Sequence, residues 1–228
     1  MPMKGGATSG YREVDRWDRG VGWIAYPEEK MQRASHALVG DDGGVWLVDP
    51  VDAPGVDEVF ADLGEVVGVV VSLDRHTRDA AAFAARHDAP VSLPTWMSGV
   101  AEDLDAPVTR YDGELGDSGF EAFRIRDSSF PRWQEVGLYR RDDRTLVVPE
   151  AVGTAAFFCA PRERVGVHPA LRPFPPRHAL GGFEPERLLV GHGPGVMSDA
   201  ASALREALDG ARRNLPAAYG RALREVLL

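Results

Sequence analysis

The sequence is poor in cysteine and in lysine. Its 228 residues include a single cysteine, Cys159, and only the lysines Lys4 and Lys30, so arginine supplies nearly all of the positive charge. A single cysteine excludes an internal disulfide framework and a zinc site built from several cysteines. Cys159 follows the apolar run AAFF, which favours a small core residue over a nucleophile.

Long apolar runs and a signal sequence are also missing. No stretch approaches the roughly 20 apolar residues that span a bilayer, and residues 1–10 contain no apolar core followed by a cleavage site. We therefore expect a cytoplasmic protein with no membrane partner. The net charge of −9 and the lack of a basic stripe argue against contact with a nucleic-acid backbone.

The length of the chain suits one domain with a sizeable core. Its 44% hydrophobic and 27% charged residues are typical of a globular protein. No internal repeat is visible. We predict a flexible, glycine-rich leader over residues 1–10 and a single domain over residues 11–228.

Short strand-like runs alternate with a few helical patterns. In the first half, the patterns predict strands at 21–26, 35–39, 45–48, 66–71 and 89–93, and helices at 54–63 and 76–87. In the second half, they predict strands at 120–125, 136–140, 145–148 and 188–190, a surface loop at 160–182, and helices at 198–215, capped by Ser198, and from 217 onward. Two strand-rich halves, each ending in helix, fit two packed sheets with helices outside, in the α/β (α+β) class.

Three motifs in a fixed order carry a resemblance to a known superfamily. They are Val45–Pro50, a strand that ends in an aspartate; Val69–Ser72, a strand that runs into a loop and an alanine-rich helix; and Leu188–Pro194, a strand that ends near a histidine. Over residues 20–215 the chain therefore resembles the metallo-β-lactamase superfamily. The resemblance implies a four-layer αββα sandwich of hydrolase ancestry.

Members of this superfamily hold one or two zinc or iron ions with a His-x-His-x-Asp-His loop, a later histidine, an aspartate and a final histidine. Such metals lower the pKa of a bound water, so that hydroxide is available near neutral pH. The resemblance implies that Asp49 braces the metal loop, that Glu150 stands in for the bridging aspartate, and that His192 is the final histidine. The later histidine has no counterpart within residues 127–131.

The histidine loop is largely missing from this sequence. Counted from the strand end, the ligand positions fall on Leu73, Arg75, Thr77 and Arg78, none of which suits a metal ion. Counted backwards from the helix, His76 falls on the last histidine of the motif, but Leu73 and Arg75 still occupy two ligand positions. An arginine beside a metal site is unfavourable because it is positively charged at any relevant pH.

A mononuclear metal site is the most specific hypothesis that remains. His76, Asp79, Glu150 and His192 would supply its ligands, since His76 and Asp79 are three residues apart at a helix start and would share a face. The metal would be zinc or iron, and the protein would hydrolyse a small ester, lactone or thioester. In the competing interpretation, which is our default expectation, Asp79 only caps or pairs within its helix, no metal binds, and the catalytic site is altered or inactive.

The arginines of the loop support a different class of function. Arg75, His76 and Arg78 at the mouth of the pocket would bind a carboxylate or phosphate, because guanidinium groups match such oxyanions. The protein would then be a non-catalytic binding domain for an anionic small molecule. The other candidate residues of the pocket are Asp49, His168 and Arg172.

A third alternative is a structural protein that binds a partner through its C-terminal helix. This helix carries Leu223, Val226 and Leu227. Otherwise a small-molecule ligand is the only partner that the sequence suggests. Measuring the metal content of the protein separates the hydrolase hypothesis from the binding domain, because a real metal site binds tightly.

Overall fold

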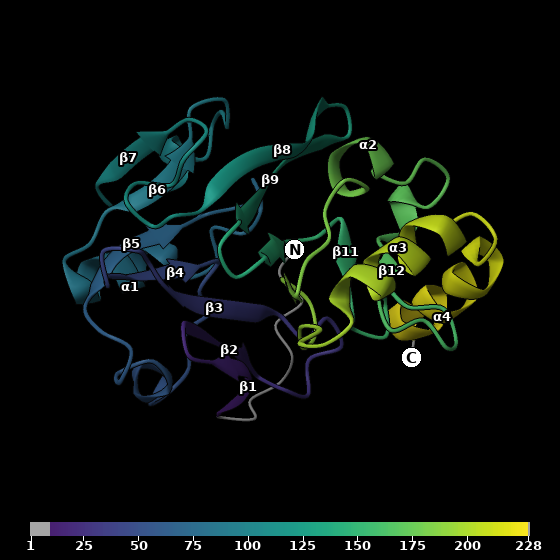
Figure 1. The fold of residues 1–228 in the computed structure, drawn as a ribbon, viewed down its shortest axis with the longest axis horizontal. Helices are drawn as coiled ribbons and strands as arrows, with labels where there is room; N and C mark the ends of the chain where they lie inside the picture. Colours follow the sequence, from purple (N-terminus) through teal and green to yellow (C-terminus); the bar gives the residue numbers. More distant parts are fainter. Residues whose placement is uncertain (1–9, 228) are drawn as a thin grey trace.

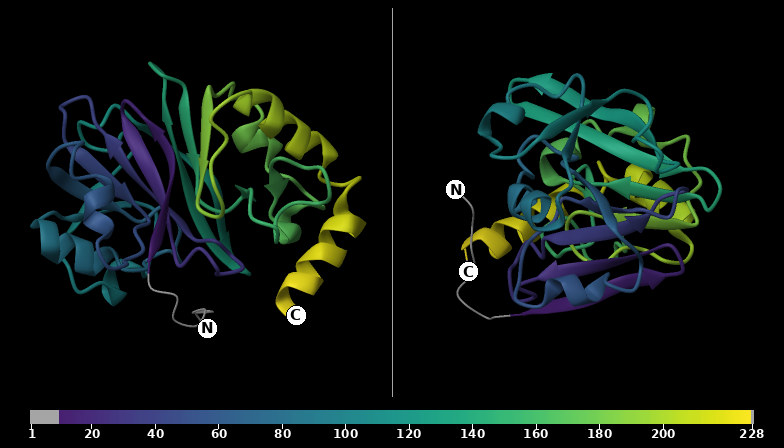
Figure 2. Two further views of the ribbon diagram at one scale, coloured as in Figure 1. Left: turned by 90° about the horizontal axis from the view of Figure 1, so that it is seen from below. Right: turned by 90° about the vertical axis from the view of Figure 1, so that its left-hand side faces the viewer.

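The computed structural model describes residues 10–227, and the side chains of residues 10–223 (Figure 1). Two β-sheets lie face to face, and the helices cover their outer sides (Figure 2). The four-layer αββα sandwich that the sequence predicts is therefore confirmed. Nearly all of the predicted leader, and the side chains of Val226 and Leu227, lie outside the described residues.

The first sheet has seven strands in chain order. They are β1 (Tyr11–Trp17), β2 (Gly20–Ala25), β3 (Ala34–Val39), β4 (Val45–Val48), β5 (Val66–Val70), β6 (Val91–Pro94) and β7 (Val108–Tyr111). The strands from β1 to β4 pair antiparallel, and those from β4 to β7 pair parallel. Parallel neighbours need a crossover connection, which between β5 and β6 is the helix α1 (Ala80–His87).

The second sheet has four strands in the order β13-β10-β9-β8. Its strands are β8 (Glu121–Ser129), β9 (Arg132–Arg140), β10 (Thr145–Val148) and β13 (Arg187–Val190), and only β10 and β13 pair parallel. Outside it lie the small sheet of β11 (Val152–Gly153) and β12 (Gly166–Val167), and the helices α2 (Arg177–Leu180), α3 (Ala200–Gly210) and α4 (Leu215–Leu227). No helix in the described part of the chain is long and apolar enough to cross a membrane.

Side chains of the central strands alternate between two cores, because successive residues of a strand face opposite sides of the sheet. In β4, Val45 and Leu47 belong to the outer core beneath α1, whereas Trp46 and Val48 belong to the core between the sheets. Leu189 of β13 meets them there from the second sheet. Burial on both faces explains why these strands are continuous apolar runs in the sequence.

The structure corrects several predicted elements in the first half of the chain. The helix predicted at 54–63 is a single 3₁₀ turn, Val56–Val59, flanked by Gly55 in a left-handed conformation with φ 78°. The apolar spacing of this segment resembles that of a helix, but Gly55 adopts a left-handed conformation directly before the turn, so no helix continues through it. The helix predicted from residue 76 begins only at Ala80, because residues 72–79 form an irregular loop.

Other elements were missed or shifted. Strands β1 and β7 lie at the two edges of the first sheet and expose many polar residues, so they lack the apolar signature of the central strands. The predicted loop at 160–182 contains β12, a 3₁₀ turn at Pro169–Leu171 and α2. Helix α3 begins at Ala200 with Asp199, and not Ser198, at its N-cap, and α4 begins at Leu215.

The carboxyl ends of β4, β5, β10 and β13 meet at one edge between the two sheets. Open α/β sheets bind ligands at this kind of edge. Isolated bridges between Arg33 and His192, and between Leu73 and Glu135, join the layers there. The fold thus gathers the residues that follow four different strands.

Candidate metal centre

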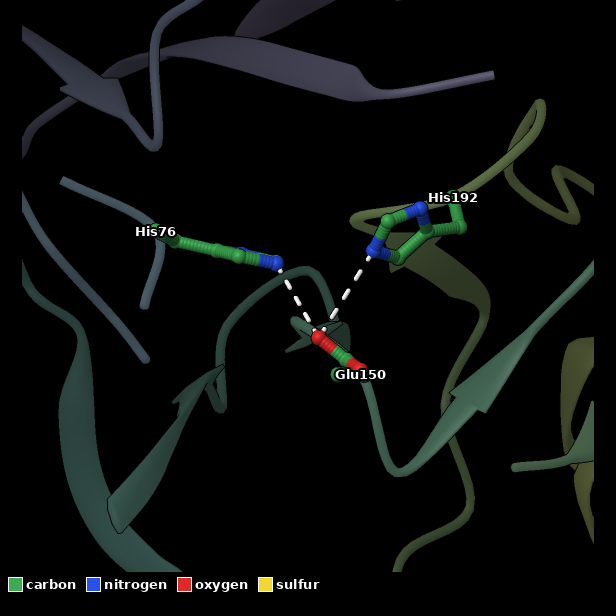
Figure 3. A group of neighbouring side chains, drawn as sticks. All are labelled: His76, Glu150 and His192. Atoms are coloured by element: carbon green, nitrogen blue, oxygen red, sulfur yellow. Dashed lines mark ion pairs between the residues drawn. The ribbon is translucent and has the colours of Figure 1, made fainter. Parts of the chain in front are cut away.

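Three buried side chains converge at this edge (Figure 3). His76 follows β5, Glu150 follows β10 and His192 follows β13, and their exposed fractions are 5%, 8% and 5%. Oε2 of Glu150 lies 3.1 Å from Nε2 of His76 and 3.7 Å from Nε2 of His192. One ligand atom from each of the three residues lies within 4.8 Å of the others. The fold therefore brings together three of the four residues proposed as ligands.

Hydrogen bonds behind each imidazole determine which nitrogen faces Glu150. Nδ1 of His76 lies 2.8 Å from Oδ2 of Asp49, and Nδ1 of His192 lies 3.0 Å from the carbonyl oxygen of Met31. Both of these oxygens are acceptors, so in the neutral form of either imidazole the proton lies on Nδ1 and the lone pair on Nε2. Nε2 of His192 is buried and has no hydrogen-bond partner. Two lone pairs thus face one carboxylate oxygen, which calls for a cation or a proton between them.

Asp49 holds His76 in this orientation. Its carboxylate accepts hydrogen bonds from the backbone N–H of Ser72, at 2.8 Å, and from the Ser72 hydroxyl. Burial alone would raise the pKa of Asp49, but His76, Arg78 and Ser72 outweigh it and lower this pKa. The residue adopts a left-handed conformation, φ 47°, of the sparsely populated kind found at functional sites. An ionised carboxylate behind a histidine is the usual support of a metal ligand.

The protonation states of the other two residues also suit a metal. Burial would raise the pKa of Glu150, but the adjacent His192 and His76 hold it well below its usual range. Burial lowers the pKa of His192, and the opposing effect of Glu150 is smaller. At neutral pH, Glu150 is therefore anionic and His192 neutral, which are the forms that bind metal ions.

The spacing of the ligand atoms fits one ion. Bonds of about 2.0–2.2 Å in a tetrahedral arrangement put neighbouring ligand atoms about 3.4 Å apart. The observed separations of 3.1 and 3.7 Å lie on either side of that value. Two histidines and a glutamate are also the protein ligands of known catalytic zinc sites, which keep a fourth position open. His76, Glu150 and His192 therefore fit a single metal ion.

Arg78 brings a positive charge to the same place. Its guanidinium donates to the carbonyl oxygens of Ala34, Asp49 and Gly191 at 2.6, 2.8 and 3.1 Å. Nη2 of Arg78 also lies 3.5 Å from Nε2 of His76. Burial lowers the pKa of Arg78 to about 10, so the group remains charged at neutral pH. Arg78 thus restricts the space and adds positive charge beside His76.

The second carboxylate oxygen of Glu150 has partners of its own. Oε1 lies 3.1 Å from Nη2 of Arg75 and 3.5 Å from Nε2 of His168. The Arg75 guanidinium also lies 4.3 Å from the ring centroid of Trp133. Nδ1 of His168 accepts a hydrogen bond from the N–H of Ala170, so its proton is on Nε2 and faces Glu150. Burial lowers the pKa of His168 to about 4 and keeps the ring neutral.

Glu135 is a site residue that the sequence did not reveal. It lies in β9 with an exposed fraction of 0%. Its carboxyl group accepts hydrogen bonds from the N–H groups of Glu150 and Ala151, at 2.8 and 2.7 Å, and from Nε1 of Trp133 at 2.7 Å. Burial raises the pKa of Glu135 to about 7, against the effect of these hydrogen bonds. The only sequence signal was an acidic residue directly before the strand predicted at 136–140.

Some candidate residues lie apart from the cluster. Asp79 is the N-cap residue of α1 and accepts a hydrogen bond from the N–H of Asp52, at 2.9 Å, so it is not part of the described three-residue group. Arg172 is fully buried and paired with Glu163, so it anchors its loop instead of lining a pocket. Leu73 is packed in the outer core of the second sheet and has no atom to offer a metal.

Comparison with known proteins identifies the fold. No family model matches the chain, and no curated protein sequence matches it. It is similar to the DIM-1 metallo-β-lactamase, with a TM-score of 0.61, 14% identity and coverage of 88% of this chain and 97% of that chain. It is also similar to a metallo-β-lactamase from Pontibacter korlensis, with a TM-score of 0.61, 11% identity and coverage of 88% of this chain and 99% of that chain. For a putative diflavin flavoprotein from Nostoc sp., the TM-score is 0.59, the identity 13%, and the coverage 90% of this chain and 97% of that chain. The chain therefore has the metallo-β-lactamase fold.

Proposed function

We propose that this protein is a hydrolase that holds one divalent metal ion, zinc or iron, between His76, Glu150 and His192. The observation that carries the proposal is that Nε2 of His76 and Nε2 of His192, the latter buried without a hydrogen-bond partner, are both directed at one oxygen of Glu150. When bound, such an ion lowers the pKa of a water molecule and makes hydroxide available near neutral pH. The substrate class that we propose is a small ester, lactone or thioester.

The surrounding residues support one ion and not two. The Asp49 carboxylate and the Met31 carbonyl fix the two imidazoles from behind. Arg75 and His168 occupy the Oε1 side of Glu150, so that only Oε2 is directed at the histidines. Arg78 adds a positive charge beside His76 that would repel a second ion.

Arg78 also favours a second candidate function, a metal-free domain that binds an anionic small molecule. In that case the guanidinium groups of Arg75 and Arg78 balance the charges of Glu150 and Asp49 without a metal. Their remaining donors would bind a carboxylate or phosphate, since guanidinium groups match these oxyanions.

Metal content distinguishes the two candidates. Wild type purified without chelator is analysed by inductively coupled plasma mass spectrometry and should hold about one equivalent of zinc or iron. The variant His192→Ala should hold less than a tenth of that, whereas His178→Ala, which removes an exposed histidine of α2, should match wild type. A wild type that takes up no metal, even after incubation with zinc and with iron(II), would contradict the hydrolase and favour the binding domain.

A further inference from the structure

A cavity along strand β8 has features of a binding site. It has a volume of about 590 Å³ and lies between β8 and residues 171–178. Leu171, Phe174 and Pro176 form an apolar part of its wall, and Arg126 contributes a positive charge. Phe174 is 81% exposed, which is unusual for so large an apolar side chain and leaves its ring available to a ligand.

Arg126 differs from the other arginine of the cavity wall. Arg124 forms an ion pair with Asp127, at 3.2 Å, and stacks 4.6 Å from the ring of Trp96. Arg126 has no ion pair within the described part of the chain, and its Nε atom is buried without a hydrogen-bond partner. The positive charge of Arg126, which lines the cavity, is therefore not balanced by an anion in the described part of the chain. An oxyanion in the cavity would balance it through the other N–H groups of the guanidinium.

Two neighbours connect the cavity to the metal centre. The guanidinium of Arg126 lies 5.7 Å from the ring centroid of Trp133, and Arg75, the partner of Glu150, stacks on the same ring. His168 lies beside Glu150 and is also the N-cap of the 3₁₀ turn that ends at Leu171, a cavity residue. The cavity wall is therefore linked, through Trp133 and His168, to the groups that surround Glu150.

We infer that this cavity binds an anionic group of the substrate on Arg126. The anion is a carboxylate or a phosphate, either of which the planar guanidinium binds through two N–H groups. The apolar body of the ligand packs against Leu171, Phe174 and Pro176. The inference rests on the proposed function, because the ligand is a substrate only if the protein is a hydrolase. It narrows the proposed substrate class to an ester, lactone or thioester that also carries a negative charge. Binding of the anion itself does not require the metal.

Calorimetric titration of metal-free protein tests the inference with three ligands of similar shape. Hexanoate and hexyl phosphate carry the anion, and hexanamide is the neutral counterpart. We expect wild type to bind at least one of the anions roughly tenfold or more tightly than hexanamide, because a charge-assisted hydrogen bond is lost with the amide. The tighter of the two anions identifies the head group that the site accepts.

Two variants locate the binding to the cavity. Arg126→Gln should lower the affinity for the preferred anion roughly tenfold or more, whereas Arg205→Gln, which removes an exposed arginine of α3 that is paired with Glu184 and lies outside the cavity wall, should bind as wild type does. Circular dichroism checks that both variants fold. If wild type binds neither anion, binds hexanamide as tightly, or binds no better than a folded Arg126→Gln, the inference is overturned. The comparison with hexanamide uses wild type alone and holds even if the variant misfolds.

The outcomes separate this inference from the proposed function. Arg126 is not a candidate metal ligand, so folded Arg126→Gln should keep the metal content of wild type. Anion binding in a protein that takes up no metal would contradict the hydrolase alone. A metal-loaded protein whose cavity ignores both anions would contradict only the inference.

Discussion

Replacing His168 by asparagine should stabilise the protein progressively, relative to wild type, as the pH falls from 6.5 to 4.5. The reason is a pair of buried groups that flank Glu150 and titrate in opposite directions. Burial lowers the pKa of His168 from 6.5 to about 4. Burial raises the pKa of Glu135 from 4.5 to about 7.

The sign of each effect depends on which state binds more protons. Between pH 4 and 6.5, His168 is protonated in the unfolded chain and neutral in the fold, so its contribution to stability is complete above pH 6.5 and is lost as the pH falls through 4. Between pH 4.5 and 7, Glu135 is protonated in the fold and ionised in the unfolded chain, so its contribution is complete below pH 4.5 and is lost as the pH rises through 7. The two effects oppose each other in wild type.

Each group alone changes the free energy of unfolding by about 1.4 kcal/mol per pH unit where its protonation differs between the two states. Over the window that the two groups share, pH 4.5 to 6.5, each contributes roughly 3 kcal/mol with opposite sign. The variant His168→Asn removes the contribution of His168 to the pH dependence of the free energy of unfolding and leaves the contribution of Glu135. Asparagine can still accept the hydrogen bond from the N–H of Ala170, so the substitution should cause only a small loss of stability that does not depend on pH.

Urea unfolding of the metal-free protein at pH 6.5, 5.5 and 4.5 measures these slopes. Relative to wild type, His168→Asn should gain roughly 3 kcal/mol across the series, and Glu135→Gln should lose a similar amount. His178→Asn, at an exposed site, serves as the control and should follow wild type. If His168→Asn keeps the pH dependence of wild type, the buried neutral imidazole has been assigned wrongly.

Two further substitutions test the support of the metal centre. Asp49→Asn removes the anion behind His76 and should weaken zinc binding about 10- to 100-fold in competition with a chromophoric chelator, whereas Asp52→Asn should not; equal affinities would show that Asp49 has no such role. Gly191→Ala would place a Cβ atom 2.2 Å from the carbonyl oxygen of Pro149 and should lower Tm by about 2–12 °C. Gly182→Ala, which meets nothing within 4 Å, should leave Tm unchanged in the same calorimetric scan, and a normal Tm for Gly191→Ala would contradict the close approach.

The fold was largely predictable because its central strands are buried on both faces. Strands such as β4 and β5 are short runs of apolar residues, and this pattern survives without any knowledge of their neighbours. The same strands fix where the chain reaches the functional edge. Asp49, Glu150 and His192 lie within two residues of the ends of predicted strands, so their convergence could be expected from topology.

Features that depend on partners distant in the sequence could not be predicted. Glu135 of β9 is a site residue because its carboxyl group accepts hydrogen bonds from the N–H groups of Glu150 and Ala151, which lie in the segment after β10. The lack of a partner for Arg126 is likewise a property of the folded cavity. Arg126 is one of many arginines and Glu135 one of many acidic residues, so neither stands out in the sequence by type or spacing.

The loop after β5 shows why the sequence could be aligned with the His-x-His-x-Asp-His motif in two registers, with no basis for a choice between them. Arg78 has φ 41°, a left-handed conformation, and its guanidinium is directed to carbonyl groups of Ala34 and Gly191, which lie on distant segments. With Arg78 held there, His76 contacts Oε2 of Glu150 and Arg75 contacts Oε1. Because carbonyl oxygens and the nearby Asp49 carboxylate already satisfy the Arg78 charge, an arginine in this loop argues against a second metal ion but not against a first.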